Sequence, residues 1–472
     1  MNTREVFAVE RSPAIEALQA FVNCRTTQSL SGPEAWEGFE RELRERVAAL
    51  EREILRRRMQ QEDVDDPHVT IDGVQHRRVT RSPSTYQTVA GPIVVERSLY
   101  RPCRAGSAKA VCPLELRVGI VAGEYTPWAA RQMATVVAAT CSREAEEIFH
   151  EMGVFRPSRS NLDRLPKVLS TRWESHRVTW ERELRESETI PIEASVVAVQ
   201  LDGVLIPSRE RTGSAEKSSR GGGPLHYREV GCGAVALYDD EGERLHTIRY
   251  GRAPEANKEA LKEQLDAELG CILPNREDLH LVLLSDGAED HWTFLEGLAA
   301  CWEQPGKVTL LVDYWHAAQH LKRAADLRHG EKTVQAKASF EKLKVILKKH
   351  PHGVHKVIRS LVAMRRGVPH SKRKALEVEI QYFRNHRSRM GYAAARRKKL
   401  PIGSGVVEAT CKTLATQRLK RSGMRWSNAG AQAILTLRAL QQTDGDRWDR
   451  AWRLITSSFH AQVETLTDRE CA

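Results

Sequence analysis

Between residues 194 and 315, three apolar runs each lead into an aspartate. Asp202 interrupts SVVAVQLDGVLIP, Asp286 ends LHLVLLSD, and Asp313 follows KVTLLV. Short apolar runs rich in β-branched residues are typical of buried strands. A carboxylate in such a strand is costly unless it is paired or binds a cation. The runs therefore predict a sheet with acidic strand ends, which is where ligands bind in open α/β sheets.

The segments between these runs alternate in type. GCGAVALYD and ERLHTIRYG predict a hairpin around the turn DDEGE, and NKEALKEQLDAEL and HWTFLEGLAACW predict helices. A loop between the first two strands, SRERTGSAEKSSRGGGP, is rich in Gly, Ser and charge, which indicates mobility. Three strands in hairpin-like order, then helix, strand, helix and strand, form an RNase H-like topology. We therefore expect an α/β RNase H-like catalytic domain.

A third acidic residue, Glu408, falls inside the helix predicted from LPIGSGVVEATCKTL. Gly403 and Gly405 flank Ser404, which is placed to cap that helix. Asp202, Asp286 and Glu408 together predict a catalytic and metal-binding triad. Mg²⁺ takes oxygen ligands, Mn²⁺ can substitute for it, and two ions about 4 Å apart can activate the attacking oxygen and stabilise the leaving one. The alternatives are a turn for Asp202, a helix cap for Asp286 and a solvated helix face for Glu408.

Two further groups accompany the triad. Asp313 and His316, in LLVDYWHAAQHL, form an Asp-x-x-His motif that is either an accessory site and rival metal position or an N-cap aspartate beside a packed histidine. A basic cluster with one aromatic residue follows Glu408 and predicts phosphate contacts and base stacking. Its members are Lys412, Arg418, Lys420, Arg421, Arg425 and Trp426.

The charge distribution also favours a polyanionic partner. The net charge is +11, but residues 320–425 alone hold 28 lysines and arginines against 6 aspartates and glutamates. The nine cysteines form no CxxC pair, which indicates a reducing compartment; Cys103 and Cys112 are two free thiols or half of a zinc knuckle. There is no signal peptide and no run of 18 apolar residues, so we expect no membrane contact and a cytoplasmic, nucleoid-associated protein.

Composition and periodicity divide the chain into five regions. SREAEEIFHEMGVFRPSRSNLDRL outlines a helix-turn-helix, with Ser158 as the N-cap of the second helix, although an ordinary helical hairpin gives the same pattern. The predicted regions are an α+β N-terminal region (1–125), a helix-turn-helix-like DNA-binding region (126–190), the first part of the catalytic core (191–330), a basic all-α insertion (331–399) and the catalytic helix with C-terminal helices (400–472).

Several motifs resemble those of DDE transposases of bacterial insertion sequences, most closely the ISKra group. They are QLDGVLIP, LLSDGAEDHW, LVDYWHAAQHL and LPIGSGVVEATCKTLATQRLKRSGMRWSNAGAQAILTLRAL. Asp-x-x-His after a strand is also similar to Mutator-like transposases. The resemblance implies an RNase H-like domain interrupted by a helical insertion, with Asp202, Asp286 and Glu408 as the DDE triad. It further implies cleavage at element ends, terminal inverted repeats and target DNA as partners, and a homo-oligomer.

Two other functions fit the same residues. One is a nuclease or resolvase of this fold without strand transfer. The other is a non-enzymatic helix-turn-helix DNA-binding protein in which the acidic residues are structural. Joining of labelled end DNA into a plasmid separates the first from a transposase, and substitution of Asp202 and Glu408 tests the second.

Overall fold

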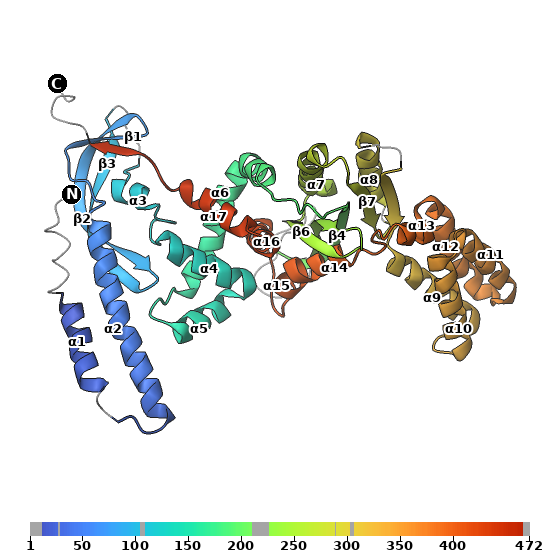
Figure 1. Cartoon of the computed structure of the whole chain (residues 1–472), viewed down its shortest axis with the longest axis horizontal. Coiled ribbons are helices and arrows are strands. Elements are labelled where there is room, and N and C mark those ends of the chain that lie inside the picture. The colour runs from blue at the N-terminus through green and yellow to red at the C-terminus, as the bar shows by residue number, and fades with distance from the viewer. Residues whose placement is uncertain are drawn as a thin grey trace, which may run out of the picture. The chain divides into compact units, whose positions relative to one another are not determined.

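The computed structural model describes residues 12–26, 29–103, 109–209, 226–287, 289–302 and 306–465. The chain forms two compact units (Figure 1). One unit contains Met1–His176 together with Asp449–Ala472, and the other contains Arg177–Trp448. The expected catalytic residues all belong to the second unit.

The first unit contains a four-stranded sheet in the order β3-β2-β1-β9. Its strands are β1 His68–Ile71, β2 Val74–Thr88, β3 Gly91–Pro102 and β9 Val463–Thr465. Strands β2 and β3 form an antiparallel hairpin that turns just before the Gly91-Pro92 step, with Thr88 opposite Gly91. Gly91 has φ +106°, a conformation that favours glycine and permits the tight reversal.

Helices make up the rest of this unit: α1 Pro13–Arg25, α2 Pro33–Gln60, α3 Pro113–Val118, α4 Pro127–Ala139, α5 Ser142–Met152 and the start of α6 Arg159–Glu186. Ser158 is the N-cap of α6, since its Oγ accepts a hydrogen bond from the backbone N–H of Asn161 at 3.4 Å. The second helix of the expected helix-turn-helix is not short, because α6 continues to Glu186. Cys103 is exposed and Cys112 is buried, and every cysteine in the described ranges is a free thiol.

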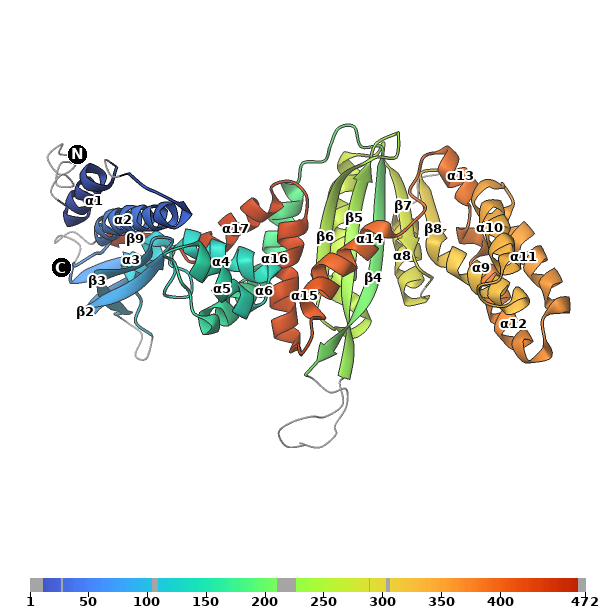
Figure 2. The same cartoon turned by 90° about the horizontal axis from the view of Figure 1, so that it is seen from below.

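The second unit is built on a five-stranded mixed sheet in the order β6-β5-β4-β7-β8 (Figure 2). Strands β4, β5 and β6 are antiparallel neighbours, whereas β7 and β8 run parallel to β4. Their bounds are β4 Val196–Ser208, β5 His226–Tyr238, β6 Arg244–Arg252, β7 His280–Ser285 and β8 Val308–Val312. All five strands expected from the apolar runs are present. Residues 210–225, which include most of the loop expected to be mobile, lie outside the described part of the chain.

Helices cover both faces of this sheet. On one face, Leu261 and Leu265 of α7 (Glu259–Ile272) lie against Gly233 of β5. On the other, Leu435 of α16 (Asn428–Gln442) lies against Gly251 of β6. The remaining elements around the sheet are η2 Ala256–Lys258, η3 Leu273–Asn275, α8 Glu289–Cys301, α14 Gly405–Thr410, the π-helix η6 Cys411–Thr416 and α15 Gln417–Leu419. Helix α17 Arg447–Ser457 begins in this unit, and its residues from Asp449 onward belong to the first unit.

A helical segment lies along the chain between β8 and α14. It consists of α9 Tyr314–His329, α10 Val334–Lys349, α11 Gly353–Met364, η4 Arg365–Gly367, α12 His370–Asn385, η5 Arg387–Arg389 and α13 Tyr392–Arg397. Its apolar faces join the core of the sheet, because Leu343, Val357 and Phe383 belong to the same buried cluster as Val199 and Leu283. The basic helices are therefore packed onto the sheet unit rather than forming a separate body.

Candidate functional site

Three aspartates lie at one level of the five-stranded sheet. The register pairs the residues two places before Asp202 and Asp286, and it pairs those one place before Asp286 and Asp313. Continued by one or two residues, this register sets Asp202 of β4 beside Asp286 and Asp313, which directly follow β7 and β8. Neighbouring strands are about 4.8 Å apart. The fold therefore gathers three carboxylates along one line of the sheet.

Asp202 lies in the middle of its strand rather than at its end, because β4 continues to Ser208. One carboxylate oxygen accepts a hydrogen bond from the Gly203 N–H at 2.6 Å, and the other lies 3.7 Å from the Cys411 Sγ. Burial raises the pKa of Asp202, and the negative charge of Asp286 raises it further. The two aspartates are thus close enough to repel each other, and a cation between them would relieve that repulsion.

Asp286 is held by a chain of buried polar groups. The Lys258 ammonium lies 2.9 Å from His291 Nε2, His291 Nδ1 lies 3.1 Å from the Ser285 hydroxyl, and that hydroxyl donates to Asp286 Oδ1 at 3.2 Å. Since an ammonium can only donate, His291 Nε2 accepts and its proton is on Nδ1, directed toward Ser285. Lys258 also pairs with Glu229 at 3.1 Å. This chain fixes the orientation of the Asp286 carboxylate from behind.

The other side of Asp286 is covered by α12. The Tyr382 hydroxyl lies 3.5 Å from the Asp286 carbonyl oxygen, and burial together with the charges of Asp286 and Asp313 raises the pKa of Tyr382. Gly287 has φ +117°, and a Cβ placed there would lie 3.4 Å from the Tyr382 ring and 3.5 Å from His386 Nε2. Glycine is therefore favoured after Asp286 by the backbone conformation, since these distances are ordinary van der Waals contacts.

Glu408 reaches this region through two connections. The Val407 N–H at the start of α14 donates to the buried Gln200 Oε1 of β4 at 3.0 Å, which fixes the helix against the strand that carries Asp202. The Ser404 hydroxyl lies 3.0 Å from Glu408 Oε1 and 2.9 Å from Asp313 Oδ2. Ser404 occupies the N-cap position, but its side chain makes no cap hydrogen bond, so the expected role of its hydroxyl is replaced by this link between carboxylates.

Asp313 and His316 have the geometry of an N-cap aspartate and a packed histidine, which is one of the two interpretations that the sequence allowed. Asp313 is the N-cap of α9, with Oδ1 accepting from the His316 N–H at 2.5 Å. Asp313 Oδ2 accepts from the N–H of Ser404, and it shares the single hydroxyl hydrogen of Ser404 with Glu408 Oε1. The His316 ring is half-buried and lies 5.1 Å from the His320 ring and 6.0 Å from the Tyr382 ring. The pair thus forms a capped helix start with a packed histidine.

The carboxylate oxygens of the site are suitable ligands for a hard divalent cation, although the structure shows no complete set of ligands among the described residues. Within the described ranges, no three His, Cys, Asp or Glu side chains converge closely enough to hold a metal ion. Asp202 and Asp286 nevertheless provide two adjacent carboxylates, and one or two carboxylates with water and substrate oxygens are sufficient for Mg²⁺. Glu408 is exposed and is held through a single serine hydroxyl.

The basic residues after Glu408 differ in exposure. Lys412, Lys420 and Arg425 are exposed. Arg418 is 4% exposed and lies over the Trp426 ring at 5.1 Å, so in this structure its guanidinium packs inside the protein rather than facing solvent. The Trp426 indole N–H donates to the Leu419 carbonyl at 2.9 Å. Arg418 and Trp426 thus stabilise the turn that presents the exposed cations.

Sequence reasoning missed the buried chain of Lys258, His291 and Ser285. A lysine that begins a helix and a histidine inside one are ordinary in a sequence, and only the fold brings them together behind Asp286. One unusual feature is that Lys258 has φ +53°, a left-handed conformation uncommon for a side chain of this size. The only local indication in the sequence was Ser285 directly before Asp286, because it places a hydroxyl beside the carboxylate.

Comparison with known proteins does not identify a family for this chain. No protein-family model matches the chain, and no curated protein matches it. Among solved structures, the chain is similar to the Drosophila P element transposase strand transfer complex, with 11% identity over 70% of this chain and 83% of that chain and a TM-score of 0.26. A likeness this distant carries no argument. Among the described helices, none is long and apolar enough to cross a membrane.

Proposed function

We propose that the protein is a DNA transposase with an RNase H-like catalytic domain, which cleaves the ends of its element and joins their 3′-hydroxyls to target DNA. The observation that carries this proposal is the alignment of Asp202 and Asp286 on adjacent strands, with α14 and Glu408 fixed to β4 through Gln200. The strand order, with three antiparallel strands followed by two parallel ones, supports the fold assignment. In this proposal the helical segment is an insertion between β8 and the helix of Glu408.

Each acidic residue has a distinct part in the proposed reaction. Asp202 and Asp286 would hold Mg²⁺ or Mn²⁺ together, and Glu408 would complete the ligand set after leaving Ser404. Bound divalent ions would activate the attacking oxygen and stabilise the leaving one. The chain from Lys258 to Ser285 keeps the Asp286 carboxylate in one orientation, as outer-shell partners of metal ligands commonly do.

DNA is the substrate best matched to the charges around this site. Lys412, Lys420 and Arg425 are exposed on the segment that follows Glu408. Because DNA carries a phosphate about every 3.4 Å along each strand, cations beside a carboxylate centre can neutralise the phosphates that flank the one under attack. Terminal inverted repeats and target DNA are the proposed partners, and an oligomer of this chain would bring two ends together.

The proposal is tested with a donor plasmid that carries the DNA flanking the gene and a labelled target plasmid. Asp202→Asn and Glu408→Gln should abolish both cleavage and joining in Mg²⁺, and chelation by EDTA should do the same to the wild type. Asp266→Asn is the matched control, since Asp266 is exposed on α7. Full activity of either active-site variant would exclude this centre.

The same assay separates strand transfer from simple cleavage. A transposase yields joined products in which a labelled 3′ end is covalently linked to the target plasmid. Cut ends without joined products, at any concentration of target, would assign the site to a nuclease or resolvase.

A further inference from the structure

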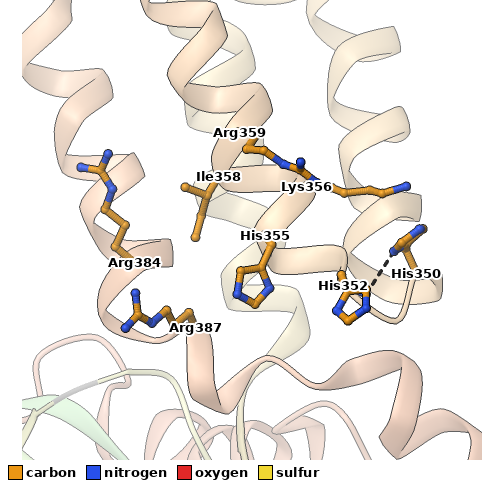
Figure 3. Close-up of a pocket in the computed structure, with 8 residues that line it drawn as sticks. All are labelled: His350, His352, His355, Lys356, Ile358, Arg359, Arg384 and Arg387. Carbon is orange, nitrogen blue, oxygen red and sulfur yellow. Dashed lines mark hydrogen bonds between the residues drawn. The ribbon is translucent and has the colours of Figure 1, made fainter.

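A cavity of about 650 Å³ opens in the helical segment (Figure 3). Seven of its eight described lining residues are histidine, lysine or arginine, and none is acidic. Figure 3 shows Arg384 and Arg387 on one side of the hollow and the helix that carries His355 and Ile358 on the other. The complete lining is His350, His352, His355, Lys356, Ile358, Arg359, Arg384 and Arg387.

The α10–α11 turn supplies two of the histidines. His350 is the C-cap of α10 and His352 the N-cap of α11, and His350 Nδ1 accepts the backbone N–H of His352 at 3.0 Å. This contact leaves the His350 Nε2–H as a free donor. Gly353 follows at a point where a Cβ would lie 2.6 Å from the Ile346 carbonyl oxygen, so no residue with a side chain fits there without a shift of the backbone.

The cations of the cavity have few internal partners. Arg384 pairs with Glu377 at 3.1 Å. Lys356, Arg359 and Arg387 form no ion pair within the part of the chain that the structure describes. Uncompensated charges of one sign repel each other, and an anion with several oxygens would remove that repulsion. The cavity is also far larger than one phosphate group requires, which favours a ligand with several of them.

The last turns of α12 connect this cavity to the carboxylate site. The Tyr382 hydroxyl lies 3.5 Å from the Asp286 carbonyl oxygen, whereas Arg384 of the same helix and Arg387 just beyond it line the cavity. The cavity and the carboxylate site therefore share α12. A DNA strand that continues beyond the cleaved phosphate is a ligand long enough to contact both.

We propose that this cavity binds the phosphodiester backbone of DNA and holds the strand that flanks the cleavage point. The inference rests on the proposed function, which it extends from a catalytic centre to a second contact site on the same substrate. The chemistry recognised is that of phosphate groups, and the histidines add a charge that depends on pH.

The test measures affinity for a fluorescent DNA duplex by anisotropy, in EDTA so that no cleavage occurs. Arg359→Gln with Arg387→Gln should weaken binding about tenfold and lower the slope of log affinity against log salt by about two, which corresponds to two lost phosphate contacts. Lys372→Gln with Lys374→Gln is the control, because it removes the same charge from exposed positions of α12 outside the cavity. Equal losses in the two pairs would overturn the proposal.

The pH dependence provides a second measurement. His350, His352 and His355 face only cations from α11, α12 and η5, except for the Glu377 carboxylate that holds Arg384. Burial and the charge of Lys356 lower the pKa of His350, so it protonates only below its ordinary range. Because a phosphate binds the protonated imidazole better, wild-type affinity should rise as the pH is lowered below the ordinary histidine range, and His350→Gln should lose part of that rise. An unchanged rise in His350→Gln would contradict a role for this histidine in binding the phosphates.

Two further outcomes separate this proposal from its foundation. If the wild type binds no DNA under any condition, the proposed function fails along with the cavity. If it binds and cleaves DNA while the Arg359 and Arg387 pair behaves as wild type, only the cavity assignment fails. Tripolyphosphate at constant ionic strength is the probe for a free phosphate ligand: tight binding that Arg359→Gln with Arg387→Gln abolishes, without loss of DNA affinity, would replace DNA as the occupant. Unchanged thermal unfolding of each variant confirms that it folds.

Discussion

Replacing Asp202 by Asn should stabilise the metal-free protein while abolishing its activity. Two carboxylates about 5 Å apart repel by about 3 kcal/mol at an effective dielectric constant near 20. Asp286 is 41% exposed, so water screens much of this repulsion, and we expect a net gain of about 1 kcal/mol. For a unit of this size, that gain raises Tm by about 2–4 °C.

The sign of the effect depends on pH in a defined way. The pKa of Asp202 in the folded protein lies above its ordinary value of 3.8, so the folded state binds the proton more tightly than the unfolded state. Stability therefore falls as pH rises from 3.8 through the raised pKa, and the full penalty is present above it. Asp202→Asn removes the electrostatic cost of an ionised Asp202, and this cost exists only when the pH approaches or exceeds the raised pKa of Asp202.

Thermal unfolding in EDTA at pH 8 and at pH 4.5 measures this directly. The variant should exceed the wild type at pH 8, and the difference should shrink at pH 4.5. Added Mg²⁺ should raise the Tm of the wild type but not of the variant. Asp266→Asn controls for the change in net charge. A lower Tm for Asp202→Asn at pH 8, or a gain that is the same at both pH values, would refute the argument.

Three other substitutions test separate parts of the structure. His291→Leu should lower the cleavage rate about 10- to 100-fold and raise the Mg²⁺ concentration needed, with DNA affinity unchanged, because it breaks the chain that orients Asp286; a rate within twofold of wild type would exclude this positioning role. Gln200→Leu should cost about 1–3 kcal/mol in urea unfolding, because it leaves the Val407 N–H buried without its acceptor. Arg447→Ala should cost about 3–5 kcal/mol in the same measurement, because Arg447 is 2% exposed and pairs with buried glutamates, Glu268 among them at 3.0 Å.

Strand positions in the sheet unit were predictable because the signals were local. VVAV and LVLL are apolar without interruption, which is what strands buried on both faces require, and the structure places β4 and β7 there. The end of β4 was less predictable. After Asp202 the side chains no longer all face the core: Leu205 is exposed and Ile206 is buried. The pairing of β4 with β5 nevertheless continues for six residues beyond the carboxylate, to Ser208.

The features that sequence reasoning missed depend on distant contacts. Nothing near Arg418 in the sequence indicates that its guanidinium covers Trp426 instead of facing solvent. The π-helix at Cys411–Thr416 shifts the helical phase, so the direction of Lys412 relative to Glu408 cannot be obtained from an ordinary 3.6-residue period. Arg447 appears in the sequence as one more cation, yet its partners Glu188 and Glu268 come from segments far earlier in the chain.

The hydrogen bonds around Asp313 decide which carboxylates are available to a metal. Asp313 is 1% exposed, and its two oxygens already accept the His316 N–H and the Ser404 N–H, while the Ser404 hydroxyl hydrogen is shared between Asp313 and Glu408. Withdrawing it would uncap α9 and leave buried donors unpaired, at a cost of about 1–3 kcal/mol for each. Glu408 loses only one serine hydroxyl when it turns away, and water can replace that bond because the side chain is exposed. Asp313 is therefore better explained as the fixed support of Ser404 and α14, whereas Glu408 is the carboxylate that can leave its present partner at the lower cost.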